Sequence, residues 1–139
     1  MKQDILLIKH GIIVHQVNCQ KKMGAGLALQ IRNKYPKVYQ SYLKHNFSLG
    51  QIQLVNVAPR LYICNLAGQD RYGYDKRYTN YNAIKIGLIK LNMIAHKQKL
   101  PVYIPRGMGC GLAGGDWNIV KKIIEETLTE CEFIIVSKN

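Results

Sequence analysis

Two glycine-rich segments decide the fold of this chain: Gln20-Lys21-Lys22-Met23-Gly24-Ala25-Gly26 and Pro105-Arg106-Gly107-Met108-Gly109-Cys110-Gly111-Leu112-Ala113-Gly114-Gly115. Each lies between a run that we predict to be a buried strand and a segment that we predict to be a helix. Glycines let backbone N–H groups approach phosphate oxygens, and a helix N-terminus adds partial positive charge. Two such loops predict a site for a diphosphate.

Neither segment matches the commoner nucleotide-binding motifs. The first lacks the GK[ST] ending of a P-loop, and neither has the GxGxxG spacing of a dinucleotide-binding fold. The alternative interpretation is that the glycines only permit tight turns between strand and helix, or end helices.

The composition predicts one globular domain over residues 1–139. Hydrophobic residues make up 47% of the 139 residues, and no repeat or linker divides the sequence. No apolar run approaches the roughly 20 residues of a membrane span, and charge interrupts the N-terminal apolar run too early for a secretory signal. We therefore expect a cytoplasmic monomer without a membrane partner.

The charge is strongly basic. Twenty Lys and Arg residues stand against eight Asp and Glu residues, which gives a formal net charge of +12. Such a balance favours an anionic partner, either nucleic acid or a phosphorylated ligand. Because the cations are spread along the whole chain, a solvated basic surface without a partner is the alternative.

The four cysteines, Cys19, Cys64, Cys110 and Cys131, form no CxxC or Cys/His cluster. We expect reduced thiols, no metal site and no cofactor. Cys64 and Cys131 fit buried positions, whereas Cys19 and Cys110 lie beside the glycine loops, where a nucleophilic thiol is a further option.

Alternating strand and helix patterns predict a three-layer α/β/α domain with a mixed central sheet. Asn80 or Thr79 is expected to cap the long helix, and Asp116 the last one. The expected strands cover 5–8, 12–17, 51–57, 61–66, 102–104 and 133–136, and the expected helices cover 27–35, 38–43, 81–95 and 117–128.

Together, the segments 12–28 and 104–117 resemble the macrodomain family. The nearest branch contains ADP-ribose glycohydrolases and an ADP-ribose-1''-phosphate phosphatase, and the likeness covers the whole chain. The resemblance implies an ADP-ribose cleft in which Asn18 contacts the distal ribose. The loops would supply the other contacts: Met23, Gly24, Ala25 and Gly26 from the first, and Arg106, Gly107, Met108, Gly109, Cys110, Gly111 and Leu112 from the second.

The polar, tyrosine-rich loop 69–78 combines charges with aromatic rings. It predicts a lid over a sugar or a stacking surface for bases, with Gln69 and Tyr74 as ligand contacts. The alternative for this loop is a solvated segment without a ligand. The alternative for Asn18 is a side chain that only stabilises a turn.

The sequence departs from the family pattern at two places. Macrodomains usually carry an acid after the first strand to bind the adenine amino group, but Lys9-His10-Gly11 contains none. The glycohydrolase branch has a lysine and an aspartate where this chain has Gln69 and Ala113. A lysine-adduct mechanism is therefore not expected.

The candidate catalytic residues are His15 and Asp116, with Asp75 in the polar loop as a further option. His15 matches the histidine of the phosphatase-like branch, and its ordinary pKa suits proton transfer. The alternatives are a hydrogen-bonded core histidine for His15 and a helix cap for Asp116. Trp117 is predicted to pack between helix and sheet.

Three functions remain open at the level of sequence. The first is an ADP-ribosyl hydrolase that acts on modified nucleic acid or protein. The second is an ADP-ribose-1''-phosphate phosphatase, and the third is a non-catalytic ADP-ribose reader. All three predict binding of free ADP-ribose.

Overall fold

The computed structural model describes residues 1–73 and 75–138. Its five strands form one sheet in the order β2-β3-β1-β4-β5, in which β2 runs antiparallel to β3 and the other neighbours are parallel. The elements in chain order are η1 (Ile5–Leu7), β1 (Gly11–Asn18), α1 (Gly26–Lys34), α2 (Pro36–Lys44), β2 (Ile52–Ala58), β3 (Leu61–Gln69), α3 (Tyr81–Gln98), β4 (Val102–Pro105), α4 (Trp117–Thr127) and β5 (Phe133–Val136).

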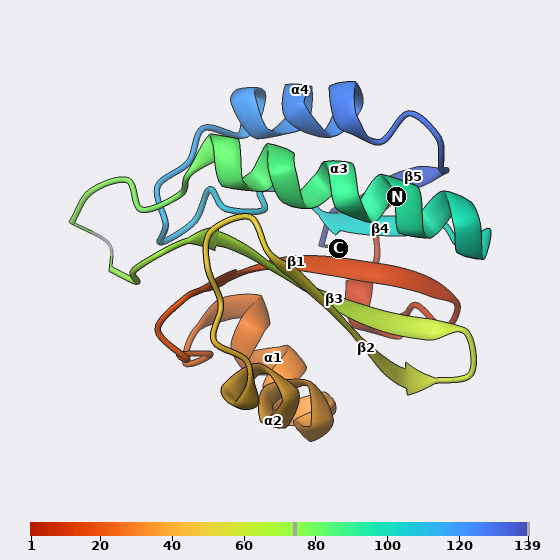
Figure 1. The fold of residues 1–139 in the computed structure, drawn as a ribbon, viewed down its shortest axis with the longest axis horizontal. Helices are drawn as coiled ribbons and strands as arrows, with labels where there is room; N and C mark the ends of the chain where they lie inside the picture. The colour runs from red at the N-terminus through yellow and green to blue at the C-terminus, as the bar shows by residue number, and fades with distance from the viewer. Residues whose placement is uncertain (74, 139) are drawn as a thin grey trace.

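Helices cover both faces of the sheet, as Figure 1 shows: α3 and α4 lie on one side, and α1 and α2 on the other. Alternate residues of β1 belong to different cores, because successive side chains of a strand point to opposite faces. Ile13 packs in the core beneath α1 and α2, and Ile12 in the core beneath α3 and α4. The predicted three-layer α/β/α domain with a mixed sheet is confirmed.

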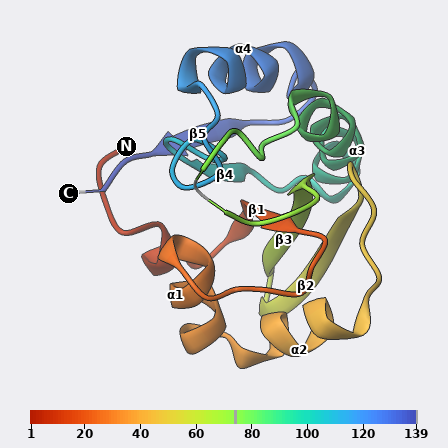
Figure 2. The same cartoon turned by 90° about the vertical axis from the view of Figure 1, so that its left-hand side faces the viewer.

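The central strand β1 determines where the loops meet. It is parallel to β3 and β4, and β4 is parallel to β5, so the carboxyl ends of four strands reach one edge of the sheet. Figure 2 looks onto this edge, where the loops after β1, β3 and β4 come together. Open α/β sheets bind ligands at this position.

Local sequence signals set the helix boundaries. Pro36 begins α2, and its fixed φ suits the first helical position. The Asn80 carboxamide accepts a hydrogen bond from Ala83 N at 2.9 Å and caps α3, whereas Thr79 does not cap it. Asp116 caps α4 through a 2.8 Å bond from Asn118 N.

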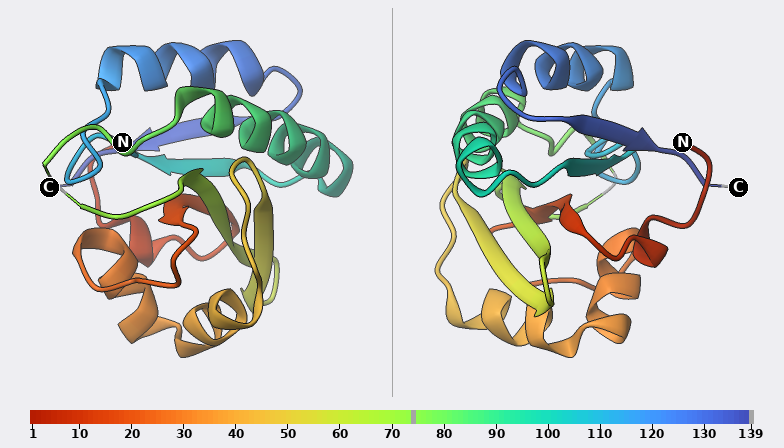
Figure 3. Two further views of the ribbon diagram at one scale, coloured as in Figure 1. Left: turned by 60° about the vertical axis from the view of Figure 1, so that its left-hand side comes forward. Right: turned by 90° about the vertical axis from the view of Figure 1, so that its right-hand side faces the viewer.

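The N-terminal segment differs from the prediction. Residues 5–8 were expected to form a strand, but Ile5–Leu7 form the 3-10 helix η1, capped by Asp4. The buried side chains of Ile5 and Leu6 pack against the core beneath α1 and α2. An isolated bridge between Lys2 and Ser137 extends the sheet there, and Figure 3 shows the N-terminal segment beside β5.

Across residues 1–73 and 75–138, no helix combines the length and the apolar character that crossing a membrane requires.

Candidate functional site

A cleft of about 920 Å³ opens at the carboxyl edge of the sheet. The last residue of each parallel strand lines it: Asn18, Gln69, Pro105 and Val136. Its size is within the roughly 300–1,000 Å³ that small-molecule sites occupy. The cleft is therefore large enough for a ligand with several chemical groups.

Most of the candidate residues predicted from the sequence come together here. Tyr74 lies outside the described residues, and neither Cys110 nor Asp116 is among the residues of the cleft wall. The candidates that line the cleft are His15, Asn18, Met23, Gly24, Ala25, Gly26, Gln69, Arg106, Gly107, Met108, Gly109, Gly111 and Leu112.

The Asn18 side chain holds the start of the first glycine loop through hydrogen bonds to its backbone. Its Oδ1 accepts hydrogen bonds from the backbone N–H groups of Gln20 (2.9 Å) and Lys22 (3.3 Å), and its Nδ2 donates to Lys22 O. The fully buried Tyr42 hydroxyl donates to Asn18 as well, and burial raises the pKa of this phenol to about 12. Asn18 is thus largely committed to holding the loop, with one Nδ2 hydrogen left for a ligand.

The first loop presents backbone donors to the cleft. None of the described residues accepts a hydrogen bond from the N–H groups of Met23, Gly24 or Ala25. The loop leads into α1, whose N-cap residue Ala25 makes no side-chain cap, and the first-turn amides of any helix lack internal partners. These donors and the helix dipole favour an anion at this wall.

The second loop presents donors from the opposite wall. Gly107 and Gly109 have φ values of 84° and 76°, which residues with a side chain rarely adopt. Short turns fold the loop back on itself, including a 2.8 Å bond from Cys110 N to Gly107 O. The N–H groups of Gly109, Gly111 and Leu112 have no acceptor within the described part of the chain.

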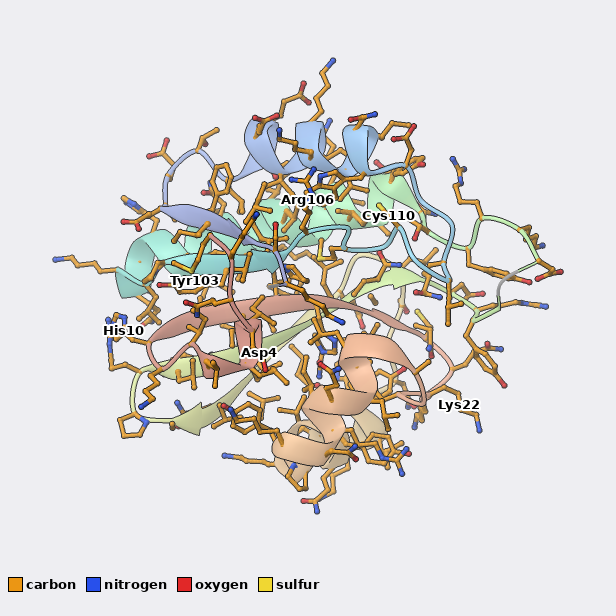
Figure 4. All side chains as sticks on the ribbon, turned by 180° about the vertical axis from the view of Figure 1, so that it is seen from behind. Asp4, His10, Lys22, Tyr103, Arg106 and Cys110 are labelled. Atoms are coloured by element: carbon orange, nitrogen blue, oxygen red, sulfur yellow. The ribbon has the colours of Figure 1, made fainter. Side chains whose placement is uncertain are left out.

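The charges of the cleft wall favour an anion as well. Three cations line it, Lys22, Arg106 and Lys138, against one carboxylate, that of Asp4. Figure 4 labels Asp4, Lys22 and Arg106, which come from three different segments of the chain. Among residues 1–73 and 75–138, the ion pair found is Lys122–Glu126. No salt bridge within these residues therefore neutralises the charged side chains of the cleft wall.

Asp4 corrects an expectation from the sequence. The strand predicted at residues 5–8 put the expected acid at residues 9–11. Residues 5–7 form η1 instead, and an acidic residue, Asp4, precedes them on the cleft wall. One oxygen of Asp4 accepts from Leu6 N at 2.9 Å, which leaves Oδ2 for a ligand donor. An aspartate directly before a short apolar run is a helix-cap signal that could have revealed this turn.

His15 lies in the central strand β1 and is buried, with 2% of its surface exposed. Its Nε2 lies 2.6 Å from Asn65 Oδ1, and Asn65 Nδ2 donates in turn to Gln53 Oε1. Because Oδ1 can only accept, His15 carries its proton on Nε2, and Nδ1 is a buried acceptor without a partner. Burial lowers the pKa of His15 to about 4, although the bond to Asn65 opposes this shift, so the ring is neutral at neutral pH.

The resemblance to macrodomains matches Gln69 and Ala113 to the lysine and the aspartate of the glycohydrolase branch. The Gln69 side chain accepts from Gln16 Nε2 at 2.9 Å and donates to Arg71 O at 2.8 Å. Ala113 is buried, and its carbonyl accepts from the N–H groups of Tyr78 and Thr79. Neither position offers an amine or a carboxylate to a ligand.

The remaining titratable candidates are absent from the cleft wall. Asp116 is exposed and caps α4, and Asp75 accepts a hydrogen bond from the Tyr78 hydroxyl, which lowers the pKa of Asp75. The cysteines are free thiols. Burial raises the pKa of Cys110 to about 11 and also raises that of Cys19, so both thiols stay protonated at neutral pH.

Comparison with curated proteins identifies distant relatives. No protein-family model matches the chain. An uncharacterized 17.5 kDa protein of Enterobacteria phage T4 is 27% identical over 134 residues, which cover 89% of this chain and 84% of that protein. The DNA ADP-ribosyl glycohydrolase of Mycobacterium tuberculosis is 25% identical over 127 residues. That match covers 86% of this chain but only 35% of the enzyme.

Solved structures show a closer likeness. A protein of unknown function from Bacteroides thetaiotaomicron is 32% identical with a TM-score of 0.87, covering 100% of this chain and 96% of that one. The macrodomain of Mycobacterium tuberculosis DarG is 23% identical with a TM-score of 0.83, covering 98% and 94%. Thermosipho africanus DarTG in complex with ADP-ribose is 20% identical with a TM-score of 0.78, covering 97% of this chain and 39% of that one.

Proposed function

The chain has the macrodomain fold, and from that premise we propose that it binds ADP-ribose in its cleft and removes ADP-ribose from a modified carrier. One observation carries the binding proposal. Two glycine loops present unpartnered backbone donors from opposite walls of a single cleft, together with three cations. A diphosphate between the loops would receive hydrogen bonds from both sides.

The residues around the loops suit the remaining parts of ADP-ribose. Asp4 lines the cleft, and its Oδ2 is a suitable acceptor for the adenine amino group. Asn18 and His15 lie on the wall near the first loop, where the resemblance to macrodomains puts the distal ribose. Met23 and Met108, whose side chains are buried, also line the cleft.

Hydrolysis in this cleft would use water as the nucleophile. Water attacks the anomeric carbon of the distal ribose, the bond to the carrier breaks, and the leaving atom of the carrier takes up a proton. His15 is neutral at neutral pH, so it can accept a hydrogen bond, but the lowered pKa makes it a weak base and leaves it no excess proton to donate. Positioning of the sugar and of the attacking water would therefore supply most of the rate enhancement.

A reader without catalytic activity is the second candidate, and one observation favours it. The positions of the glycohydrolase lysine and aspartate hold Gln69 and Ala113, and Gln69 is tied up in hydrogen bonds. A non-catalytic protein that binds ADP-ribose needs only the backbone N–H donors of the loops and the cations of the cleft wall.

A turnover screen separates these functions. The protein is incubated with ADP-ribosylated DNA, RNA and protein, and with ADP-ribose-1''-phosphate. Release of ADP-ribose from a carrier supports the hydrolase, and release of inorganic phosphate supports a phosphatase instead. Binding of ADP-ribose without any turnover leaves the reader, and absence of binding contradicts all three functions.

A further inference from the structure

Thr79 is a buried polar residue that the helix cap does not use. It precedes the cap residue Asn80, and only 2% of its surface is exposed. Its hydroxyl accepts a hydrogen bond from Gln16 Nε2 at 2.9 Å and donates to Gly109 O at 2.5 Å. The three residues form a relay from the central strand β1 to the second glycine loop.

The relay fixes the orientation of a peptide group in that loop. Gly109 O also accepts from Gly115 N at 2.9 Å, so two donors hold this carbonyl on the protein side of the loop. A Cβ at Gly109 would lie 2.7 Å from Gln16 Oε1, which shows how closely the loop backbone approaches β1. Consecutive hydrogen bonds strengthen one another, so the Gln16 contact also stabilises the Thr79 contact.

We propose that Thr79, oriented by Gln16, is a positioning residue for the diphosphate: it presets the second glycine loop by holding the peptide group that joins Gly109 C=O to Cys110 N–H. This peptide group lies between the two that carry the N–H groups of Gly109 and Gly111, so fixing it restricts the directions of both donors. The inference rests on the proposed binding of ADP-ribose. A preset loop binds more tightly because the ligand does not have to order it. Thr79 itself is absent from the cleft wall, so it acts through the loop.

The test compares Thr79→Val, which removes the hydroxyl at nearly constant volume, with Thr79→Ser, which keeps it. The matched control is Thr127→Val, because Thr127 is also buried and its hydroxyl donates to Ile123 O, within α4. Calorimetry measures affinity for ADP-ribose and for adenosine, which has no phosphate. We expect Thr79→Val to weaken ADP-ribose binding about tenfold, the effect of one hydrogen bond, with little change for adenosine. Thr79→Ser should stay near the wild type, and so should the control.

Amide hydrogen exchange provides a second measurement that needs no ligand. In Thr79→Val, the N–H of Gly115 should exchange faster, because its acceptor Gly109 O is no longer held. Unchanged ADP-ribose affinity in Thr79→Val overturns the proposal, and so does an equal loss for adenosine. If Thr79→Val fails to fold, Thr79→Ala, which removes the same hydroxyl from a residue outside the cleft wall, decides in its place. Absence of ADP-ribose binding in the wild type counts against the proposed function, and Gly115 exchange still decides whether the relay holds the loop.

Discussion

Gly24 offers the cleanest single-residue probe of the cleft. A Cβ built on it meets no atom within 4 Å, and its φ is not in the left-handed region, yet Gly24 lines the cleft. A side chain at residue 24 would therefore fill part of the cleft without disturbing the fold. Gly109 is a poorer probe, because its positive φ and its contact with Gln16 would strain the loop itself.

We therefore expect Gly24→Val to abolish measurable ADP-ribose binding and Gly24→Ala to weaken it less, since one methyl group fills less of the cleft. Calorimetry measures the affinities, and thermal unfolding serves as the folding control, with unchanged midpoints expected. Wild-type affinity in a folded Gly24→Val protein would place the ligand elsewhere.

His15 links the site to the pH dependence of stability. The unfolded chain binds a proton at this residue with a pKa of 6.5, whereas burial in the folded state lowers the pKa to about 4. Between these values the unfolded state holds more protons, so stability falls as the pH drops from 6.5 to 4. The His15 contribution to this loss is about 3 kcal/mol. Below pH 4 the residue adds no further loss.

Replacing His15 by Gln should flatten this part of the profile. Urea unfolding at a series of pH values measures the free energy of unfolding for the wild type, for His15→Gln and for a control, His96→Gln, in which an exposed histidine is changed. A profile for His15→Gln as steep as that of the wild type would show that His15 is not the group responsible.

At the scale of elements, the start of α4 bears on whether Asp116 is a helix cap or a catalytic residue. The structure shows its carboxylate as the N-cap of α4, off the cleft wall. Asparagine caps a helix about as well as aspartate, but alanine does not, and the loss costs about 1 kcal/mol.

We expect Asp116→Asn to keep both stability and turnover, and Asp116→Ala to lose about 1 kcal/mol of unfolding free energy with turnover retained. Chemical denaturation and the best substrate of the turnover screen provide the two readouts. A large loss of turnover in a stable Asp116→Asn protein would instead make the carboxylate catalytic.

Elements with strong local signals could be predicted from the sequence. Pro36, Asn80 and Asp116 mark helix starts by their own chemistry, and the apolar strands follow from their patterns. Residues 5–8 were predicted wrongly, because four apolar residues do not distinguish a strand from a short buried turn. This error also hid Asp4.

The site was predictable only in part, for a physical reason. The composition of a glycine loop next to a strand predicts an anion site, and both glycine loops of this chain line the cleft. The residues that hold the loops give no such signal, because their partners are distant in sequence. Thr79 contacts a glycine 30 residues away, and Tyr42 contacts Asn18 across 24 residues.

At the scale of the whole molecule, the net charge of +12 suggests that the carrier of ADP-ribose is a nucleic acid. Phosphate contacts with lysine and arginine release counterions, so affinity should fall steeply with salt. We expect modified DNA to bind more weakly at physiological than at low salt, and a modified peptide to change much less. Fluorescence anisotropy with both carriers measures this. Equal, nearly salt-independent affinity would mean that the charge does not serve carrier binding.

The central claim is that the two glycine loops form one diphosphate site for ADP-ribose. Calorimetric titration of the intact protein with ADP-ribose tests it most directly, with Gly24→Val and Thr127→Val measured alongside. We predict saturable binding of one ADP-ribose per chain for the wild type and for Thr127→Val, and none for Gly24→Val. Absence of heat from the folded wild type at millimolar ADP-ribose, or equal binding by Gly24→Val, would contradict the claim.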